Sequence, residues 1–169
     1  RQEVSPWKNS GAILLISCYE LGHQPTALAS PLARLRRAGY APAAMDLSVN
    51  PFSPERAGEA LFVGISVPMH TALRLGVSTA RKIREANSSC HICLYGLYAN
   101  LNADYLLERD ASSVIGGEIE VPLENLIGAL ESGLSPSSVS GVGTRERPAQ
   151  PYLEKPLPIL PSREGLPPL

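Results

Sequence analysis

Short, continuous apolar runs alternate along the chain with segments whose apolar side chains recur every three or four positions. Runs of the first kind are typical of strands buried on both faces of a sheet, and the second pattern is typical of amphipathic helices. Strands are predicted over residues 12–17, 43–47, 61–67, 91–95 and 113–115. Because strands and helices alternate through short connections, we expect an α/β protein with a doubly wound, five-stranded parallel sheet in the order 2-1-3-4-5.

Polar and small residues mark where the helices between these strands begin and end. Ser53 precedes Pro54, a pair that predicts an N-cap followed by proline at the first helical position. Gly39 is well placed to end the helix that follows the first strand. Asn102 is predicted to cap a helix through Leu106 and Leu107.

The composition changes after residue 133. The segment 134–169 holds eight of the chain's 16 prolines, together with serine and glycine and few apolar clusters. Proline cannot donate the backbone hydrogen bond of a central strand or continue a helix, so an extended form is expected there. We predict an N-terminal extension over 1–11, one folded domain over 12–133 and a proline-rich linker over 134–169, which leads to a further domain.

The charge balance narrows the classes of partner. Hydrophobic residues make up 44% of the chain, charged residues 18%, and the net charge is −1. Such a chain offers no basic stripe for a nucleic acid or an anionic membrane, and its apolar runs are too short to cross a bilayer. We expect no nucleic-acid and no membrane partner, and a cytoplasmic location; the pattern says nothing of the oligomeric state.

Three cysteines, Cys18, Cys90 and Cys93, make a disulfide framework improbable in a chain without a secretory signal. Cys90 and Cys93 form a C-x-x-C pair where a strand begins, and residues three apart on a strand point to opposite faces. Since no second pair of ligands stands at a suitable spacing, buried thiols are favoured over a zinc site.

A ligand site is expected at the carboxyl ends of the strands, where the strand order reverses. The loops that meet there supply the candidate cofactor-binding residues. They are Tyr19, Glu20, Leu21, Gly22, His23, Gln24, Ser66, Val67, Pro68, Met69, His70, Gly96, Leu97, Tyr98, Gly116, Gly117 and Glu118. No catalytic residue is predicted among them.

The histidines and glycines of these loops each allow two interpretations. His23 or His70 could bind a cofactor metal or a bound ring, or could be an ordinary loop histidine at a helix start. Gly96, Gly116 and Gly117 could admit a bulky ligand to the backbone or supply positive φ in turns. Glu118 is interpreted first as a residue at the start of the last helix, where acids favour the helix dipole. His91 enters a strand and is interpreted as structural.

Several familiar sites of α/β sheets are excluded by residues that the chain lacks. The first loop has one glycine, Gly22, so it does not form a dinucleotide-binding G-x-G-x-x-G. The layout is flavodoxin-like, yet this loop also lacks the serine and threonine of a flavin phosphate loop. No aspartate ends the third strand, as a phosphoacceptor domain requires, and no nucleophile–base pair suits a free-standing enzyme.

The order of several motifs nevertheless resembles one known family. Ile13-Leu14-Leu15-Ile16, the segment 28–40 and Met45-Asp46 are similar to the opening of the cobalamin-binding domain that precedes many radical S-adenosylmethionine cores. The segment 61–66 resembles the third strand of that domain, and 110–120 resembles its D-x-x-x-x-G-E-x-E ending of strand five. The segments 19–25 and 95–102 resemble a subgroup with a short cysteine-containing tail.

This resemblance implies a cobalamin-binding module of a larger radical enzyme. S-adenosylmethionine and a 4Fe-4S cluster would belong to a downstream radical domain of the same chain, because C-x-x-x-C-x-x-C is absent here. The family's D-x-H-x-x-G, whose histidine binds cobalt, is replaced by Glu20-Leu21-Gly22-His23-Gln24, which leaves His23 as a possible cobalt ligand. The alternative is a domain that binds no cofactor and serves for docking or substrate recognition.

Overall fold

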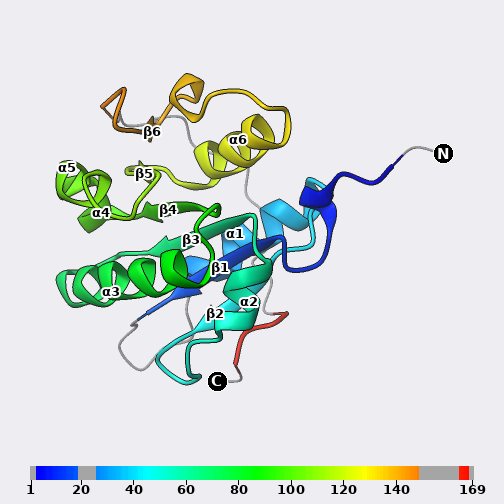
Figure 1. The fold of residues 1–169 in the computed structure, drawn as a ribbon, viewed down its shortest axis with the longest axis horizontal. Helices are drawn as coiled ribbons and strands as arrows, with labels where there is room; N and C mark the ends of the chain where they lie inside the picture. Colours follow the sequence, from blue (N-terminus) through cyan, green and yellow to red (C-terminus); the bar gives the residue numbers. More distant parts are fainter. Residues whose placement is uncertain (1–2, 19–25, 149–163, 168–169) are drawn as a thin grey trace.

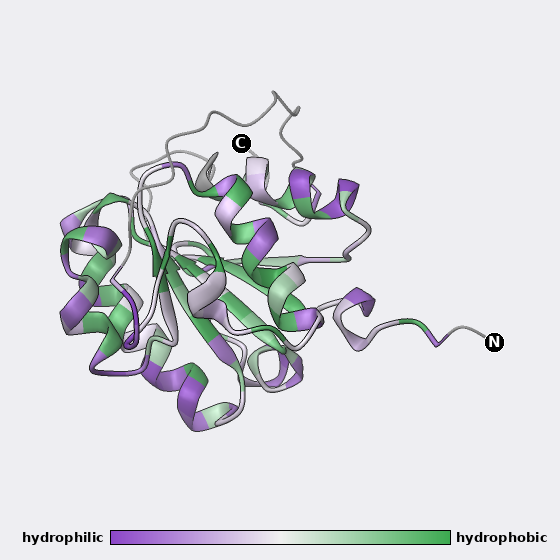
Figure 2. Ribbon diagram, turned by 90° about the horizontal axis from the view of Figure 1, so that it is seen from above, coloured by the Kyte–Doolittle hydropathy of each residue, from purple (hydrophilic) through white to green (hydrophobic). Residues whose placement is uncertain are grey.

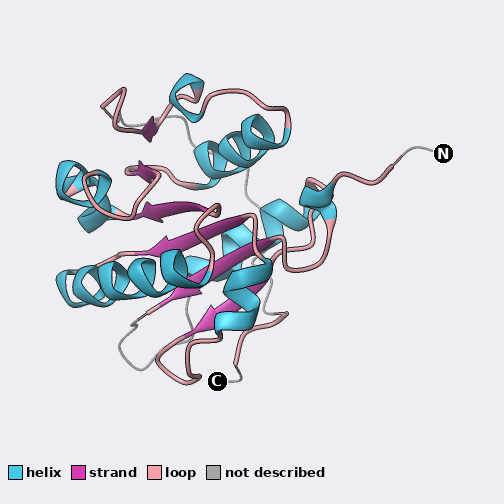
Figure 3. Cartoon of the chain, viewed as in Figure 1, coloured by secondary structure: helices cyan, strands magenta, loops and turns pink. Residues whose placement is uncertain are grey.

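One sheet of six strands forms the centre of the computed structural model, which describes residues 3–18, 26–148 and 164–167. The strand order is β2-β1-β3-β4-β5-β6, and β1 to β5 are parallel (Figure 3). The strands are β1 (Ile13–Ser17), β2 (Ala43–Asp46), β3 (Phe62–Ser66), β4 (His91–Tyr95), β5 (Ser113–Ile115) and β6 (Val142–Gly143). The predicted α/β class and the order of the five parallel strands are therefore confirmed.

The predicted count of five strands is wrong, because β6 adds a sixth. This strand pairs antiparallel with β5, with Val142 opposite Ile115, and lies inside the range 134–169 that was expected to be a linker. Its two residues carry no periodic pattern for a sequence-based prediction to detect. The strand forms because β5 would otherwise present an unpaired edge of backbone N–H and C=O groups.

Helices cover both faces of the sheet (Figure 1). One face is covered by α2 (Pro54–Glu59), α3 (His70–Ala86), α4 (Leu97–Leu101) and α5 (Ala103–Leu107). The other is covered by α1 (Thr26–Arg37) and α6 (Glu120–Glu131). Two short 3-10 helices, η1 (Pro6–Lys8) and η2 (Pro136–Ser138), complete the secondary structure of the described residues. None of the helices in these residues is long and apolar enough to cross a membrane.

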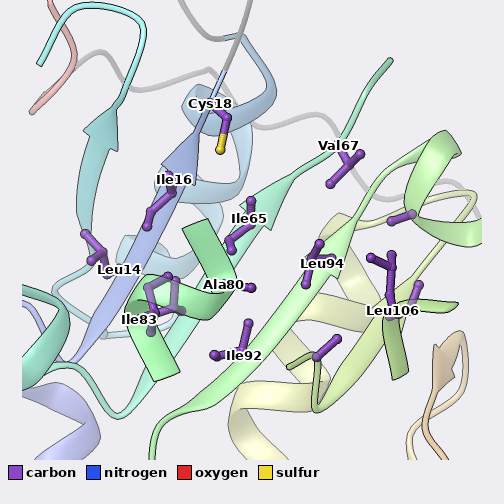
Figure 4. Packing of buried hydrophobic residues seen from close by; sticks show 14 of the residues in the cluster. Leu14, Ile16, Cys18, Ile65, Val67, Ala80, Ile83, Ile92, Leu94 and Leu106 are labelled. Carbon is purple, nitrogen blue, oxygen red and sulfur yellow. The ribbon is translucent and has the colours of Figure 1, made fainter. Parts of the chain in front are cut away.

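Alternate residues of each strand enter different hydrophobic cores. In β1, Leu14 and Ile16 pack toward α3, whereas Ile13 and Leu15 pack toward α1 and α6. Figure 4 shows the first core, in which Ile83 of α3 lies over the strands. The strands carry the apolar colour of Figure 2, and the hydrophilic colour lies on the helices and loops around them. This burial on both faces explains why the strands are continuous apolar runs in the sequence.

The cysteines follow this alternation. Cys90 lies in the core under α3, and Cys93 lies in the core under α1 and α6. The two thiols therefore occupy opposite sides of the sheet, as their spacing on a strand predicts. Burial raises the pKa of Cys90 to about 11 and that of Cys93 to about 12, so both thiols stay protonated at neutral pH.

The predicted helix starts after Ser53 and Asn102 are confirmed, and the one at Glu118 needs correction. Asn102 is the N-cap residue of α5, as predicted, and also the C-cap residue of α4. Its side chain forms no cap hydrogen bond to α5, because its Nδ2 donates to the Tyr98 carbonyl at 2.8 Å. Glu118 precedes α6, which begins at Glu120. The predicted N-cap at Ser53 is confirmed, because its hydroxyl accepts a hydrogen bond from the Arg56 backbone N–H at 3.3 Å.

Candidate functional site

The candidate site is the edge of the sheet where β1, β3, β4 and β5 end, the side toward which the arrowheads of these strands point in Figure 3. Loops 66–70, 96–100 and 116–118 lie at this edge within the described part of the chain. The first predicted loop, with Tyr19, Glu20, Leu21, Gly22, His23 and Gln24, lies outside the described residues. The geometry below therefore concerns the three other loops and the residues beside them.

Backbone hydrogen bonds join the loops after β3 and β4. The Val67 N–H donates to the Tyr95 carbonyl at 2.7 Å, and the Tyr98 N–H donates to the Val67 carbonyl at 3.3 Å. Gly96, which follows Tyr95 in the chain, has a φ of +118°. A Cβ on Gly96 would lie 2.7 Å from the Val67 carbonyl oxygen. Glycine is therefore required here both for its positive φ and for the close approach of the two chains.

The loop after β3 is layered from the core outward. Ser66 and Val67 are buried, Met69 is half-buried, and Pro68 and His70 are exposed. Because only the outer members reach the surface in this structure, a ligand at this edge would meet Pro68 and His70 first. Ser66 and Val67 are buried and join the loop to the hydrophobic core.

His70 and Tyr98 bring two of the predicted loops together. His70 is the first residue of α3, Tyr98 lies in α4, and their rings meet edge to face with centroids 6.2 Å apart. Tyr98 is half-buried against the first core, whereas His70 is exposed. The N-cap of α3 is Met69, which forms no side-chain cap hydrogen bond. The pair thus presents an imidazole and an aromatic ring side by side at the edge.

The glycines after β5 differ in their surroundings. Gly117 is exposed and has φ of +68°, so it supplies the positive φ that one of the two sequence readings anticipated. Gly116 is buried, and the space that a Cβ would occupy contains Asn100 of α4, whose Cβ and Cγ lie 2.3 Å from that point. Glu118 follows as an exposed residue. The absence of a side chain at Gly116 therefore allows α4 to pack against the end of β5. This role differs from both interpretations of the sequence, which were close approach of a ligand and positive φ.

Two residues that are not among the candidate cofactor-binding residues also lie at this edge. Cys18 follows β1 and is buried, with its Sγ 3.5 Å from the Thr79 hydroxyl oxygen. Burial raises the pKa of the Cys18 thiol, against an opposing effect of the bond to Thr79. Asp46 ends β2, and its Oδ1 accepts hydrogen bonds from the Ser48 N–H at 2.9 Å and hydroxyl at 2.6 Å. Both therefore serve local structure: a protonated thiol is a poor nucleophile, and the carboxylate holds a turn.

His91 lies at the opposite edge of the sheet, where β4 begins. Its Nε2 is 2.8 Å from the Ser113 hydroxyl of β5, and its ring stacks on Phe62 of β3. Burial, with a smaller effect of the Arg84 charge, lowers the pKa of His91 to about 4. In the residues that the structure describes, no three His, Cys, Asp or Glu side chains are grouped closely enough to hold a metal ion.

Comparison with known proteins finds structures of similar fold but no related sequence family. The sequence matches no protein-family model and no curated protein. The fold is similar to part of a radical methyltransferase. The structure of radical S-adenosylmethionine methyltransferase TsrM from Kitasatospora setae, solved with cobalamin and a [4Fe-4S] cluster bound, superposes with a TM-score of 0.68 at 15% identity. That alignment covers 89% of this chain and 31% of TsrM.

A second structure of TsrM gives the same result. It contains the tryptophan substrate and a SAM analogue, and it superposes with a TM-score of 0.63 at 17% identity over 83% of this chain and 31% of TsrM. The chain thus spans about a third of the length of TsrM. At these identities the similarity establishes a shared fold.

Proposed function

We propose that this chain is a cobalamin-binding module of a radical S-adenosylmethionine enzyme and holds the corrin against the carboxyl edge of the sheet. The observation that carries the proposal is the superposition of nearly the whole chain on TsrM, which was solved with cobalamin bound. The motif resemblance supports it independently, because it rests on residues and not on the fold. In a larger enzyme, bound cobalamin supplies the cobalt that carries a transferable group.

The side chains at the edge suit the chemistry of a corrin, which has apolar faces and a rim of carboxamide groups. Leu97 is 61% exposed, and Pro68 lies exposed on the neighbouring loop, so both offer apolar contact to a flat ring. His70, Tyr98 and Asn100 offer hydrogen-bonding groups within the same two loops. These residues would hold the corrin, with Gly117 and Glu118 on the far side.

The remaining cofactors are assigned to a downstream radical domain. S-adenosylmethionine and the 4Fe-4S cluster would bind there, since the 169 residues contain no C-x-x-x-C-x-x-C. His23 is the candidate cobalt ligand of the first loop, and membership of the subgroup with a cysteine-containing tail belongs to the same proposal. Reading the parent gene for clustered cysteines after Leu169 tests the assignment to a radical enzyme.

Titration with hydroxocobalamin tests the binding itself. The chain should shift the visible spectrum of the cofactor and retain cobalt through gel filtration. Leu97→Arg should reduce this binding at least about tenfold, because it places a long cation where the ring would pack. Leu134→Arg is the matched control: Leu134 is 60% exposed but follows α6 at the opposite edge, so its substitution should leave binding unchanged.

Three outcomes would count against this function. Absence of both the spectral shift and cobalt retention would overturn cofactor binding and favour a docking or substrate-recognition domain. Equal loss of binding in the Leu97 and Leu134 variants would overturn the placement of the corrin at this edge. Loss of the folded state in Leu97→Arg, checked by circular dichroism, would contradict our description of Leu97 as a surface residue.

A further inference from the structure

We propose that the outer face of α3 and α5 is a contact surface between two copies of this chain, related by a two-fold axis that runs along the groove between these helices. The surface belongs to the helical layer over one face of the sheet and not to the carboxyl edge (Figure 1). The inference therefore does not depend on cofactor binding. It rests on an apolar groove, on the exposed apolar side chains around it and on two strips of opposite charge.

The groove between α3 and α5 is mostly apolar. It has a volume of about 260 Å³ and is lined by Leu73, Arg74, Val77, Asn102 and Tyr105. The Tyr105 side chain is 44% exposed, and the Arg109 guanidinium lies 3.5 Å from the centre of its ring. Arg109 Nη1 also donates to the Tyr105 carbonyl at 3.0 Å. The ring is thus held in place and loses little conformational entropy when a partner packs on it.

Exposed apolar side chains are concentrated around this groove. Of the eight large apolar side chains that are exposed in the described ranges, four belong to α3, α4 and α5: Leu75, Leu97, Leu101 and Tyr105. The other four belong to separate segments of the chain: Val4, Val49, Leu61 and Leu134. Single exposed apolar residues are ordinary, whereas a group of them on one face is typical of a surface that contacts another protein.

Two strips of opposite charge flank the groove. The exposed Arg74 and Arg81 are two helical turns apart on α3, and the exposed Asp104 and Glu108 lie on and directly after α5. In the part of the chain that the structure describes, none of these four side chains forms an ion pair. Both helices run from the carboxyl edge toward the amino edge of the sheet, because α3 follows β3 and α5 precedes β5. Arg74 and Asp104 therefore lie nearer the carboxyl edge, and Arg81 and Glu108 nearer the amino edge.

Opposite charges on the two sides of an apolar groove make this surface complementary to itself. A two-fold axis parallel to the helices and placed over the groove brings α3 of one copy against α5 of the other. Arg74 of each copy then faces Asp104 of the other, Arg81 faces Glu108, and every contact occurs twice. The two Tyr105 rings meet near the axis. A partner of uniform charge would match one strip and be repelled by the other, and the net charge of −1 adds little repulsion between copies.

Sedimentation velocity measures this association. Over about 5–500 µM the unaltered chain should show a reversible monomer–dimer equilibrium, as expected for a weak interface with a small apolar centre. Arg74→Glu and Asp104→Arg should each weaken dimerisation about tenfold, because each variant sets like charges against each other at two places in the interface. Arg37→Glu is the matched control: Arg37 is an exposed arginine at the end of α1, on the other face of the sheet, so dimerisation should change by less than about twofold.

A mixture of the two weakened variants tests the two-fold arrangement directly. In a mixed dimer, the substituted position 74 of one copy faces the substituted position 104 of the other, and the second contact is the unaltered one. Equimolar mixing of Arg74→Glu with Asp104→Arg should therefore restore dimerisation to within about threefold of the unaltered chain. The pair Arg81→Glu and Glu108→Arg repeats the test at the other contact, and circular dichroism verifies that each variant is folded.

Three results would contradict the dimer. A monomer throughout the concentration range would exclude it and leave this face to another domain or protein. Equal weakening by Arg37→Glu and Arg74→Glu would place the contact elsewhere on the molecule. Failure of the mixture of folded variants to regain dimerisation would exclude the two-fold arrangement. If the unaltered chain instead dimerised but bound no hydroxocobalamin, only the proposed function would be wrong.

Discussion

Gly96 has the most constrained backbone conformation among the residues of the candidate site. Its φ of +118° and ψ of 177° lie in a region open almost only to glycine. The Val67 carbonyl oxygen also fills the position of a side chain. Gly96 therefore determines how closely the loops after β3 and β4 approach each other, and with them His70 and Tyr98.

Gly96→Ala should lower the free energy of unfolding by about 3 kcal/mol, from backbone strain together with the clash against Val67. Gly128→Ala is the control: Gly128 lies inside α6 with open space around it, so alanine should raise the free energy of unfolding by about 0.5–1 kcal/mol. Urea unfolding of both variants measures the two effects. If Gly96→Ala left the free energy of unfolding unchanged, the loops after β3 and β4 would not be held together by the close contact at Gly96.

At the scale of the elements, the amino end of β4 is fixed to its neighbours through side chains. His91 bonds Ser113 of β5 and stacks on Phe62 of β3, while Arg84 at the end of α3 donates to the Cys90 and Asp110 carbonyls. These contacts join one helix and three strands at a single point. Their geometry depends on a neutral imidazole, because protonation would place a buried charge beside Arg84.

The stability contributed by this neutral imidazole should depend on pH. The folded-state pKa of about 4 is below the unfolded value of 6.5, so the unfolded chain binds the proton more tightly. The neutral imidazole contributes its full share of the free energy of unfolding above pH 6.5. As the pH falls from 6.5 toward 4, the free energy of unfolding drops by up to about 3 kcal/mol.

Urea unfolding between pH 4 and pH 7 should therefore show a steeper loss of stability in the unaltered chain than in His91→Gln, which keeps a group able to bond Ser113. An NMR titration that places the pKa of His91 near 6.5 would contradict this prediction.

At the scale of the whole molecule, the sheet is completed by residues that the composition assigned to a linker. Val139 and Val142 are buried in the second core, and β6 covers the edge of β5. Arg145 donates to the carbonyls of Leu107 and Arg109 near the end of α5. The segment up to residue 148 thus contributes to the packing of the domain.

A chain shortened to residues 1–133 should be less stable than one shortened to 1–148 by at least about 3 kcal/mol, since it loses the burial of two valines. It should also associate through the uncovered edge of β5. Urea unfolding and sedimentation velocity of the two chains measure these effects. Equal stability and equal monomer content would support a domain boundary at residue 133.

The terminal segments also reach the second core from distant positions in the sequence. Trp7 and Leu166 pack against that core, and Arg36 Nη2 donates to the Glu164 carbonyl at 3.1 Å. The sequence patterns alone did not predict these contacts, because isolated apolar residues in irregular segments have no periodicity.

The sequence by itself determined the α/β class, the five parallel strands and their order, because burial on both faces requires continuous apolar runs and a helix requires its three-to-four residue period. It also indicated the edge at which a site should lie. Tertiary structure alone decided that Asn100 occupies the space over Gly116, that Val67 restricts Gly96, and that two residues near 142 add a strand. Each of these depends on contact between segments far apart in the chain, which no local pattern encodes.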